Sequence, residues 1–426
     1  MSSIKLQLSD YRAVKSADVT ISDITVMAGP NGSGKSTVSQ LLNGLINGIN
    51  NFEQDMMDEL FKSFKRELSR IRRAIPDSQA LRSLVASVNE DKAEMDVMEQ
   101  IRRGVDGLHR ALLGFIEREE DGNELQRRVD YIIGSEFSLF SSSIGERIEA
   151  YCDSLYNRYE ALYQNTQQKI GARKASDLFL SVVANYSSLS GAVTNVTLWE
   201  DNHPVLEGGS FSDLLSVRKS IYINASSSVF YSGFDLATYR LKNMVTSDLP
   251  AGADDATNKI LKELSLSIGG EIYLDSEMGS FLRFRNKSGV NIYLEEAASG
   301  IQSLAVLYRL LYAGLLDNET VLILDEPESH LHPQWIVELA KILVKINKNV
   351  GTKILIASHC PDLVSALYNL AKVYDVEDIR FYQTYQDGNG SQYTFKDCGG
   401  EISDIFESFN IALERISCYG RMVQER

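Results

Sequence analysis

Residues 29–36, GPNGSGKS, carry the pattern GxxxxGK[ST], in which each residue type suits contact with phosphate. The glycines let the backbone curl until its N–H groups face phosphate oxygens, and the start of a following helix adds favourable dipole charge. We expect Lys35 to reach the last two phosphates, Ser36 to bind Mg²⁺ through its hydroxyl, and Thr37 to hydrogen-bond the first phosphate. The alternative is a glycine-rich turn that binds no nucleotide. The predicted triphosphate site consists of Gly29, Asn31, Gly32, Ser33, Gly34, Lys35, Ser36 and Thr37.

Residues 321–327, VLILDEP, form an apolar segment that ends in two acids. A strand without polar positions must be buried on both faces, so its carboxyl end delivers the acids to the edge where open α/β sheets bind ligands. We expect Asp325 to hold Mg²⁺ through its water shell and Glu326 to polarise the attacking water as a general base. A lone Asp-Glu pair would be read as a solvated strand end, but here a phosphate loop lies upstream.

Two further segments end or begin with polar groups. Ser299 and Gly300 open a long apolar helix, where a hydroxyl and free N–H groups suit an anion, although a plain helix cap would have the same residues. The apolar strand 354–358 ends at His359, and a histidine at such a place is by itself more often a strand-end residue. His330 and His332 lack the further ligands that would define a zinc site.

Strand and helix signals surround these motifs. Alternating residues from 4 to 21 and the apolar run 24–28 predict strands, and the pattern from 37 to 46 predicts a helix. Strand signals return at 196–199 and 220–224, a hairpin is predicted for 271–274 with 281–284, and residues 299–358 alternate as parallel βα units. The predicted fold class is α/β: a mixed sheet with a phosphate-loop βα core and an antiparallel β subdomain.

Residues from 51 to about 171 differ in character, with more charge and with apolar residues at heptad spacing. The stripes are short, so we expect a compact helical insertion rather than a long coiled-coil arm, and it could be purely structural or a docking surface. We assign 1–49 and 190–426 to the head and 50–189 to the insertion. The stripes are Met57, Phe61, Phe64, Leu68, Ile71, Ile75; Met98, Ile101, Val105, Leu108, Leu112, Phe115; and Ile144, Ile148, Tyr151, Leu155.

Composition limits the classes of function. The polar start of the chain and the interrupted apolar run 301–316 favour neither a signal peptide nor a membrane span, so we expect a cytoplasmic protein that does not contact membranes. Four separated cysteines indicate reduced thiols. A net charge of -15 opposes general binding to nucleic acid, and the local exception is a basic stretch, Lys62, Lys65, Arg66, Arg70, Arg72 and Arg73.

The order of these motifs resembles that of ABC ATPases. The resemblance implies ATP and Mg²⁺ as cofactors, Ser299 and Gly300 as a signature that faces the ATP of the opposite subunit, and His359 as the histidine that bonds the terminal phosphate. Residues 327–333 resemble the dimer-contacting D-loop. The segments 298–302 and 325–333 are most similar to the RecF/SMC-related ATPases of the OLD family and to relatives in the Septu, Gabija, PARIS and retron systems, whose first strand places an aromatic-arginine pair, here with Arg12, near the nucleotide.

This resemblance predicts a function and two alternatives. The leading hypothesis is a sensor or regulatory ATPase of a bacterial antiphage defence system, which forms a homodimer or higher oligomer and controls a separately encoded nuclease or toxin. The main alternative is a RecF- or SMC-like repair ATPase that binds duplex DNA; a transporter subunit fits less well, because Ile301 interrupts the usual LSGGQ. We expect no nuclease domain, since residues 360–426 are too few for a Toprim fold and the acids Asp375, Glu377 and Asp378 read as a solvated loop. No glutamine is assigned to a Q-loop.

Overall fold

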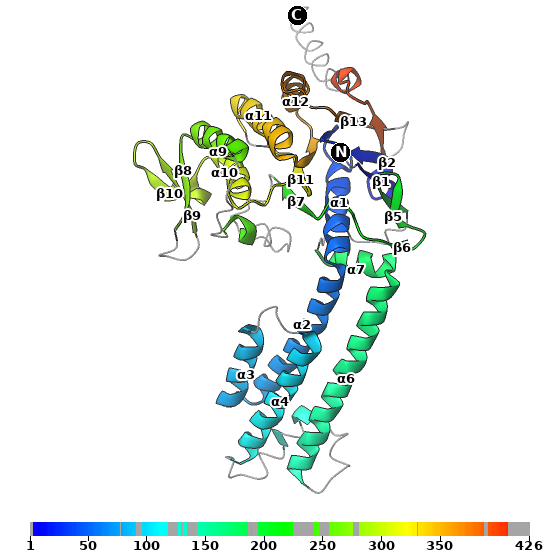
Figure 1. Ribbon diagram of the computed structural model, residues 1–426, viewed down its shortest axis with the longest axis vertical. Helices are drawn as coiled ribbons and strands as arrows, with labels where there is room; N and C mark the ends of the chain where they lie inside the picture. The colour runs from blue at the N-terminus through cyan, green and yellow to red at the C-terminus, as the bar shows by residue number, and fades with distance from the viewer. Residues whose placement is uncertain are drawn as a thin grey trace, which may run out of the picture. The chain divides into compact units, whose positions relative to one another are not determined.

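The computed structural model describes residues 3–76, 78–90, 96–117, 127–128, 131–133, 143–185, 189, 195–224, 242–246, 255–275, 281–329, 331–386 and 391–407 (Figure 1). The chain divides into two compact units. The first, here called the head, comprises Met1–Asn50 and Lys174–Arg426, and the second, the insertion unit, comprises Asn51–Arg173. His330, considered above for a zinc site, and Cys418, one of the four cysteines, lie outside the described residues.

One mixed sheet of 11 described strands organises the head, in the order β6-β5-β4-β1-β2-β14-β13-β3-β12-β11-β7. Alternating burial along β1 and β2 shows that the N-terminal pattern has one buried face. The strands are β1 Ile4–Tyr11, β2 Val14–Ile21, β3 Ile24–Ala28, β4 Val196–Glu200, β5 His203–Glu207, β6 Ser210–Phe211, β7 Lys219–Asn224, β11 Thr320–Asp325, β12 Lys353–Ser358, β13 Ile379–Gln386 and β14 Tyr393–Asp397.

The centre of this sheet is parallel, and its register brings the motifs to one edge. β3, β11 and β12 are buried at every position, as their apolar sequences predict. Ser358 pairs with Ala28, and Asp325 pairs with both Ala357 and Asn224. The phosphate loop, the two acids and His359 therefore all follow the carboxyl ends of adjacent strands, where open α/β sheets bind ligands.

Helices pack around the sheet and against each other. α1, Lys35–Asn50, contacts β7, β11 and β12, while α11, Pro333–Val350, contacts α12, Pro361–Val373. A second, antiparallel sheet consists of β8 Gly270–Asp275, β9 Phe281–Asn286 and β10 Asn291–Tyr293, so the predicted hairpin is confirmed. It adjoins α9, Asp255–Ile268, which packs on α10, Ser299–Tyr312; η2 spans Leu294–Glu296.

One helix that we expected within the insertion lies in the head. α7, Ala175–Asn185, packs on α1, where a Cβ on Gly48 would lie 3.0 Å from Leu178. Leu178 and Val182 are fully buried. The structural boundary thus falls at Arg173 rather than at 189, because α7 buries its apolar face against the first helix of the head.

The insertion unit is a bundle with its own core. α2 Phe52–Ala74, α4 Val97–Ile116 and α6 Ile144–Ala172 pack on one another, and α3 Gln79–Glu90 packs on α2 and α4. Phe64 is fully buried, edge-on to Tyr159 and against Gly104. All stripe residues predicted from the sequence except Met57 belong to this core or pack against it. Among the described residues, no helix is both long and apolar enough to cross a membrane.

Candidate nucleotide-binding site

The phosphate loop leaves β3 at Ala28 and owes its shape to close neighbours. A Cβ on Gly29 would lie 1.8 Å from the hydroxyl of Thr384 on β13. Gly34 has φ +91°, and a Cβ there would lie 2.6 Å from a methyl of Val14 on β2. These positions require glycine because the adjacent strands leave no room for a side chain.

The amine of Lys35 lies inside this loop. Its Nζ donates hydrogen bonds to the carbonyls of Gly29 at 2.9 Å and Pro30 at 2.8 Å, and the residue is 4% exposed. Burial lowers the pKa of Lys35 below its ordinary value. Negative charges oppose this shift, in order of size those of Glu326, Asp325 and Glu328. The amine of the loop and the acids after β11 therefore share one electrostatic environment.

Asp325 is buried at the end of β11 and is held by neighbouring hydroxyls. Its Oδ2 accepts a 2.7 Å hydrogen bond from Tyr222 on β7, and the amide of Gln40 on α1 donates to the same tyrosine oxygen at 3.2 Å. Burial raises the pKa of Asp325, and hydrogen bonds from Tyr222 and Ser36 oppose the shift. Tyr222 was not found from the sequence, where it is one aromatic residue within an apolar strand.

The oxygen atoms around Asp325 fit Mg²⁺. Oδ1 of Asp325 is buried without a hydrogen-bond partner among the described residues, and Ser36 lies within hydrogen-bonding reach of the same carboxylate. The described residues contain no group of three or more His, Cys, Asp or Glu that could hold a metal by itself. A magnesium ion commonly takes one or two protein oxygens together with phosphates and water, which the Asp325 carboxylate and the Ser36 hydroxyl can supply.

Glu326 has an unusual backbone. Its φ is 50°, in the left-handed region that residues other than glycine rarely adopt, and its N–H donates to the carbonyl of Ala357 at 2.8 Å. The turn places its Oε1 3.6 Å from Nδ1 of His359. Such strain is often concentrated at functional sites, where surrounding structure holds it in place. The two residues predicted to act on water and phosphate are thus adjacent.

The carboxylate of Glu328 is a second acid beside the histidine. It is 6% exposed, and its Oε1 lies 3.3 Å from Nδ1 of His359. We did not single out Glu328 from the sequence, although its place directly after the Asp-Glu-Pro segment was the available signal.

The other predicted residues are spread around the loop. Ser33 is buried with its hydroxyl 3.4 Å from the Lys35 amine, whereas Asn31, Gly32 and Ser36 are exposed and Thr37 is half-buried. Arg12 has φ 55° in the turn between β1 and β2, next to the Ala13 and Val14 that adjoin Gly34. The structure therefore places Arg12 in the turn that packs on the phosphate loop.

Ser299 and Gly300 form the first turn of α10. The cap of this helix is Ala298, which makes no side-chain cap bond, so Ser299 does not serve as the N-cap. Ser299 is exposed, while Gly300 is buried, and a Cβ on Gly300 would lie only 3.0 Å from the ring of Trp335 on α11.

His332 accepts a hydrogen bond from Gln334 N and caps α11. Asp378 is 3.2 Å from Arg380 in an ion pair, as a solvated loop allows.

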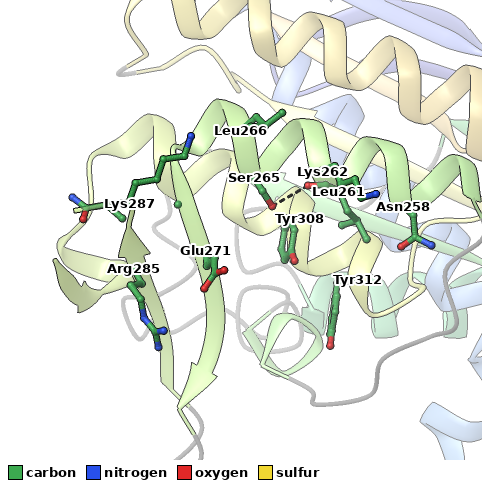
Figure 2. A pocket seen from close by; sticks show the side chains of 12 residues that line it. Asn258, Leu261, Lys262, Ser265, Leu266, Glu271, Arg285, Lys287, Tyr308 and Tyr312 are labelled. Carbon is green, nitrogen blue, oxygen red and sulfur yellow. Dashed lines mark hydrogen bonds between the residues drawn. The ribbon is translucent and has the colours of Figure 1, made fainter. Parts of the chain in front are cut away.

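A pocket of about 830 Å³ lies elsewhere in the head, between α9, α10 and the second sheet (Figure 2). The rings of Tyr308 and Tyr312 stack along it, with centroids 6.1 Å apart, and Arg285 and Lys287 lie at the opposite side in the view. None of the motif residues lines this pocket. It shares only helix α10 with the signature residues.

Residues 179–365 match the family model described as "AAA domain, putative AbiEii toxin, Type IV TA system". Over 57 residues the chain is 46% identical to the energy-coupling factor transporter ATP-binding protein EcfA2 of Clostridium perfringens strain SM101, covering 13% of this chain and 20% of that protein. An ABC transporter ATP-binding protein of C. perfringens strain 13 matches to the same extent. The chain thus spans about a fifth of the length of these curated relatives.

Solved structures similar to the chain include two SMC head domains. That of Thermotoga maritima has 11% sequence identity and a TM-score of 0.35, over 93% of this chain and 99% of that one. That of Pyrococcus furiosus, with an extended coiled coil and bound to the C-terminal domain of ScpA, has 13% identity and a TM-score of 0.36, over 98% and 100%.

Proposed function

We propose that this chain, an α/β protein with an ABC-type ATPase head, binds Mg²⁺·ATP and hydrolyses it. The observation that carries this proposal is the arrangement of charges at the carboxyl ends of the central parallel strands. There the buried amine of Lys35 interacts electrostatically with Asp325, Glu326 and Glu328. The family match over 179–365 and the ATP-binding relatives support the same activity.

Each residue has a distinct role in this proposal. Ser36 and Asp325 hold Mg²⁺, which neutralises phosphate charge when bound. Lys35 contacts the last two phosphates, and the loop N–H groups receive the phosphate oxygens. Glu326 polarises water, and His359 bonds the terminal phosphate. The 3.6 Å approach of Glu326 to His359 supports their joint action on the same reacting group.

The signature residues act in a dimer. Ser299 is exposed in the first turn of α10 and is not its cap, which agrees with a role toward another molecule. We infer that Ser299 and Gly300 of one copy complete the ATP site of the other, so that ATP holds two heads together. Higher oligomers would be built from such dimers.

Substitution Glu326→Gln tests the activity. We expect ATP binding to persist while turnover falls by roughly 10²- to 10⁴-fold, because the general base is lost and the magnesium ligands remain. Glu319→Gln, an exposed acid at the opposite end of β11, is the matched control. Light scattering should show an ATP-dependent dimer of the Glu326→Gln protein; wild-type turnover by that protein would remove Glu326 from catalysis.

For the biological role, we propose a regulatory subunit of a bacterial antiphage defence system that controls a separately encoded nuclease or toxin. The family description, which names a toxin and a type IV TA system, supports this class of role. The insertion unit is our proposed dock for the effector, because it has a core of its own and carries none of the predicted nucleotide-site residues.

Removal of the insertion unit tests whether this unit is the docking site of the effector. A chain in which a short Gly-Ser linker replaces residues 51–173 should still bind ATP, since α7 and α1 remain packed in the head. In a pull-down it should no longer bind the protein encoded by the neighbouring gene. Cells that carry the shortened chain should also lose protection against phage. If the shortened chain still binds that partner, the docking site lies on the head instead.

A second candidate function is DNA binding during repair. The observation that favours it is the basic helix α2, where Lys62, Arg72 and Arg73 are exposed. Other members of the stretch are already paired: Arg66 lies 2.6 Å from Glu59, and Arg70 lies 2.7 Å from Glu67. This pairing reduces the free positive charge and leaves the defence role better supported.

A further inference from the structure

The carboxylate of Glu328 makes its contacts through a single oxygen. Oε1 accepts a 2.7 Å hydrogen bond from the hydroxyl of Ser358 and a 3.0 Å bond from the backbone N–H of His359. The same atom lies 3.3 Å from Nδ1 of the His359 ring. Oε2 is buried and has no hydrogen-bond partner among the described residues. Burying a carboxylate with one oxygen unsatisfied costs stability, so the position calls for a reason other than packing.

These contacts fix the turn that presents the histidine. Ser358 ends β12, and its hydroxyl oxygen also accepts a 3.0 Å bond from the N–H of Cys360. Cys360 has no side-chain cap bond to α12, which begins at Pro361. Glu328 therefore ties the loop after β11 to the turn between β12 and α12. One oxygen atom of Glu328 thus accepts a hydrogen bond from the backbone of His359 and also lies beside its ring.

The ring contact also distinguishes the two ring nitrogens. Nδ1 faces Glu328 at 3.3 Å and Glu326 at 3.6 Å, and it makes no hydrogen bond to a described residue. In catalytic sites such contacts commonly tighten when substrate binds. A carboxylate beside one nitrogen keeps the proton there and so determines which nitrogen meets the substrate. Here that leaves Nε2 to meet the substrate.

We propose that Glu328 is the positioning residue of the ATPase site, which sets the orientation and proton location of His359 so that Nε2 meets the terminal phosphate. The inference rests on the proposed ATPase function and deepens it. Glu328 touches neither nucleotide nor water in this scheme, and it differs in this from Glu326, which acts on water. Its effect on turnover must therefore pass through His359.

A double-mutant cycle tests this dependence. We expect Glu328→Gln to lower kcat by about tenfold or more, as loss of such supporting partners does elsewhere, and to change KM for ATP less than about twofold. His359→Ala should lower kcat further, and the double variant should be no slower than His359→Ala alone. Non-additivity of this kind is expected when one residue acts only through the other. Thermal melting of each variant, with Glu319→Gln as control, shows whether it folds.

Each outcome separates the two proposals. Multiplicative effects in the double variant, or wild-type kcat in Glu328→Gln, would overturn the positioning role while ATPase activity of the unaltered chain still supports the function. If Glu328→Gln does not fold, Ser358→Ala replaces it in the same cycle, since it removes the hydroxyl that donates to Oε1. No hydrolysis by the unaltered protein would remove the proposed function and this inference together.

Discussion

The hydroxyl of Tyr222 and Oδ2 of Asp325 are joined by a 2.7 Å hydrogen bond between two parallel strands, across 103 positions of sequence. β7 and β11 pair so that Ile223 lies opposite Leu324, which brings the tyrosine alongside the buried acid. The bond leaves Oδ1 of Asp325 unpaired among the described residues. Tyr222 thus fixes which oxygen faces the proposed magnesium ion.

Loss of the tyrosine hydroxyl should weaken the use of magnesium. In Tyr222→Phe the buried oxygen of Asp325 loses a partner, a change of about 1–3 kcal/mol for such groups. We expect the Mg²⁺ concentration that gives half-maximal ATPase activity to rise by about fivefold or more. Tyr312→Phe, in the pocket of Figure 2, is the control. An unchanged magnesium titration would assign Tyr222 to packing alone.

Lys35→Ala should impair nucleotide binding itself, because the phosphates lose their charged partner. Titration with a fluorescent ATP analogue should show at least a tenfold weaker Kd, in contrast to Glu326→Gln, which should keep its affinity. Lys348→Ala serves as control, because the amine of Lys348 donates to the carbonyl of Asp375, away from the phosphate loop motif. Equal affinity of Lys35→Ala and wild type would place the nucleotide elsewhere.

Gly32 and Gly34 of the loop should respond differently to alanine. Both have positive φ, 78° at Gly32 and 91° at Gly34, but only Gly34 has a neighbour within reach, Val14 at 2.6 Å. Strain alone costs about 1–3 kcal/mol, so Gly34→Ala should lower Tm more than Gly32→Ala. Adding Val14→Ala should recover part of the loss. Equal shifts without recovery would mean that Val14 does not constrain the loop.

The basic helix α2 offers a test of DNA binding. Reversal of Lys62, Arg72 and Arg73 to glutamate should leave duplex affinity unchanged if the helix is a protein dock, as we propose. A DNA-binding helix would instead bind duplex more weakly, with a salt slope smaller by roughly 0.9 for each phosphate that is no longer neutralised. The same number of reversals at the exposed head residues Lys259, Lys287 and Lys372 is the control.

The purified chain should not cut DNA or RNA with any divalent metal. Two-metal cleavage needs clustered carboxylates around a phosphate site, and our proposal assigns the carboxylate pair Asp325 and Glu326 to the ATP site. Incubation of plasmid and single-stranded RNA with Mg²⁺ or Mn²⁺ checks this. Cleavage that disappears on substitution of Asp375, Glu377 or Asp378 would reveal a C-terminal active site and overturn the expectation.

Local patterns of sequence determined much of the site. The phosphate loop, the acids after an apolar strand and the heptad stripes each depend on residues close in the chain, so their spacing alone predicts a turn, a buried strand or a packed helix. α1, β11, β12 and the core of the insertion unit follow those predictions. The apolar strand before Asp325 also predicted that its two acids would lie at the ligand-binding edge of the sheet.

Only the tertiary structure decided which side chains support the site. Tyr222 reaches Asp325 through strand pairing, and Glu328 reaches Ser358 and His359 across 30 residues or more. Thr384 approaches Gly29 because β13 lies beside β3. The periodic pattern of apolar residues in the sequence does not predict these contacts, because they depend on the order and register of the strands. The same holds for α7, whose apolar face could have packed in either unit until the fold placed it against α1.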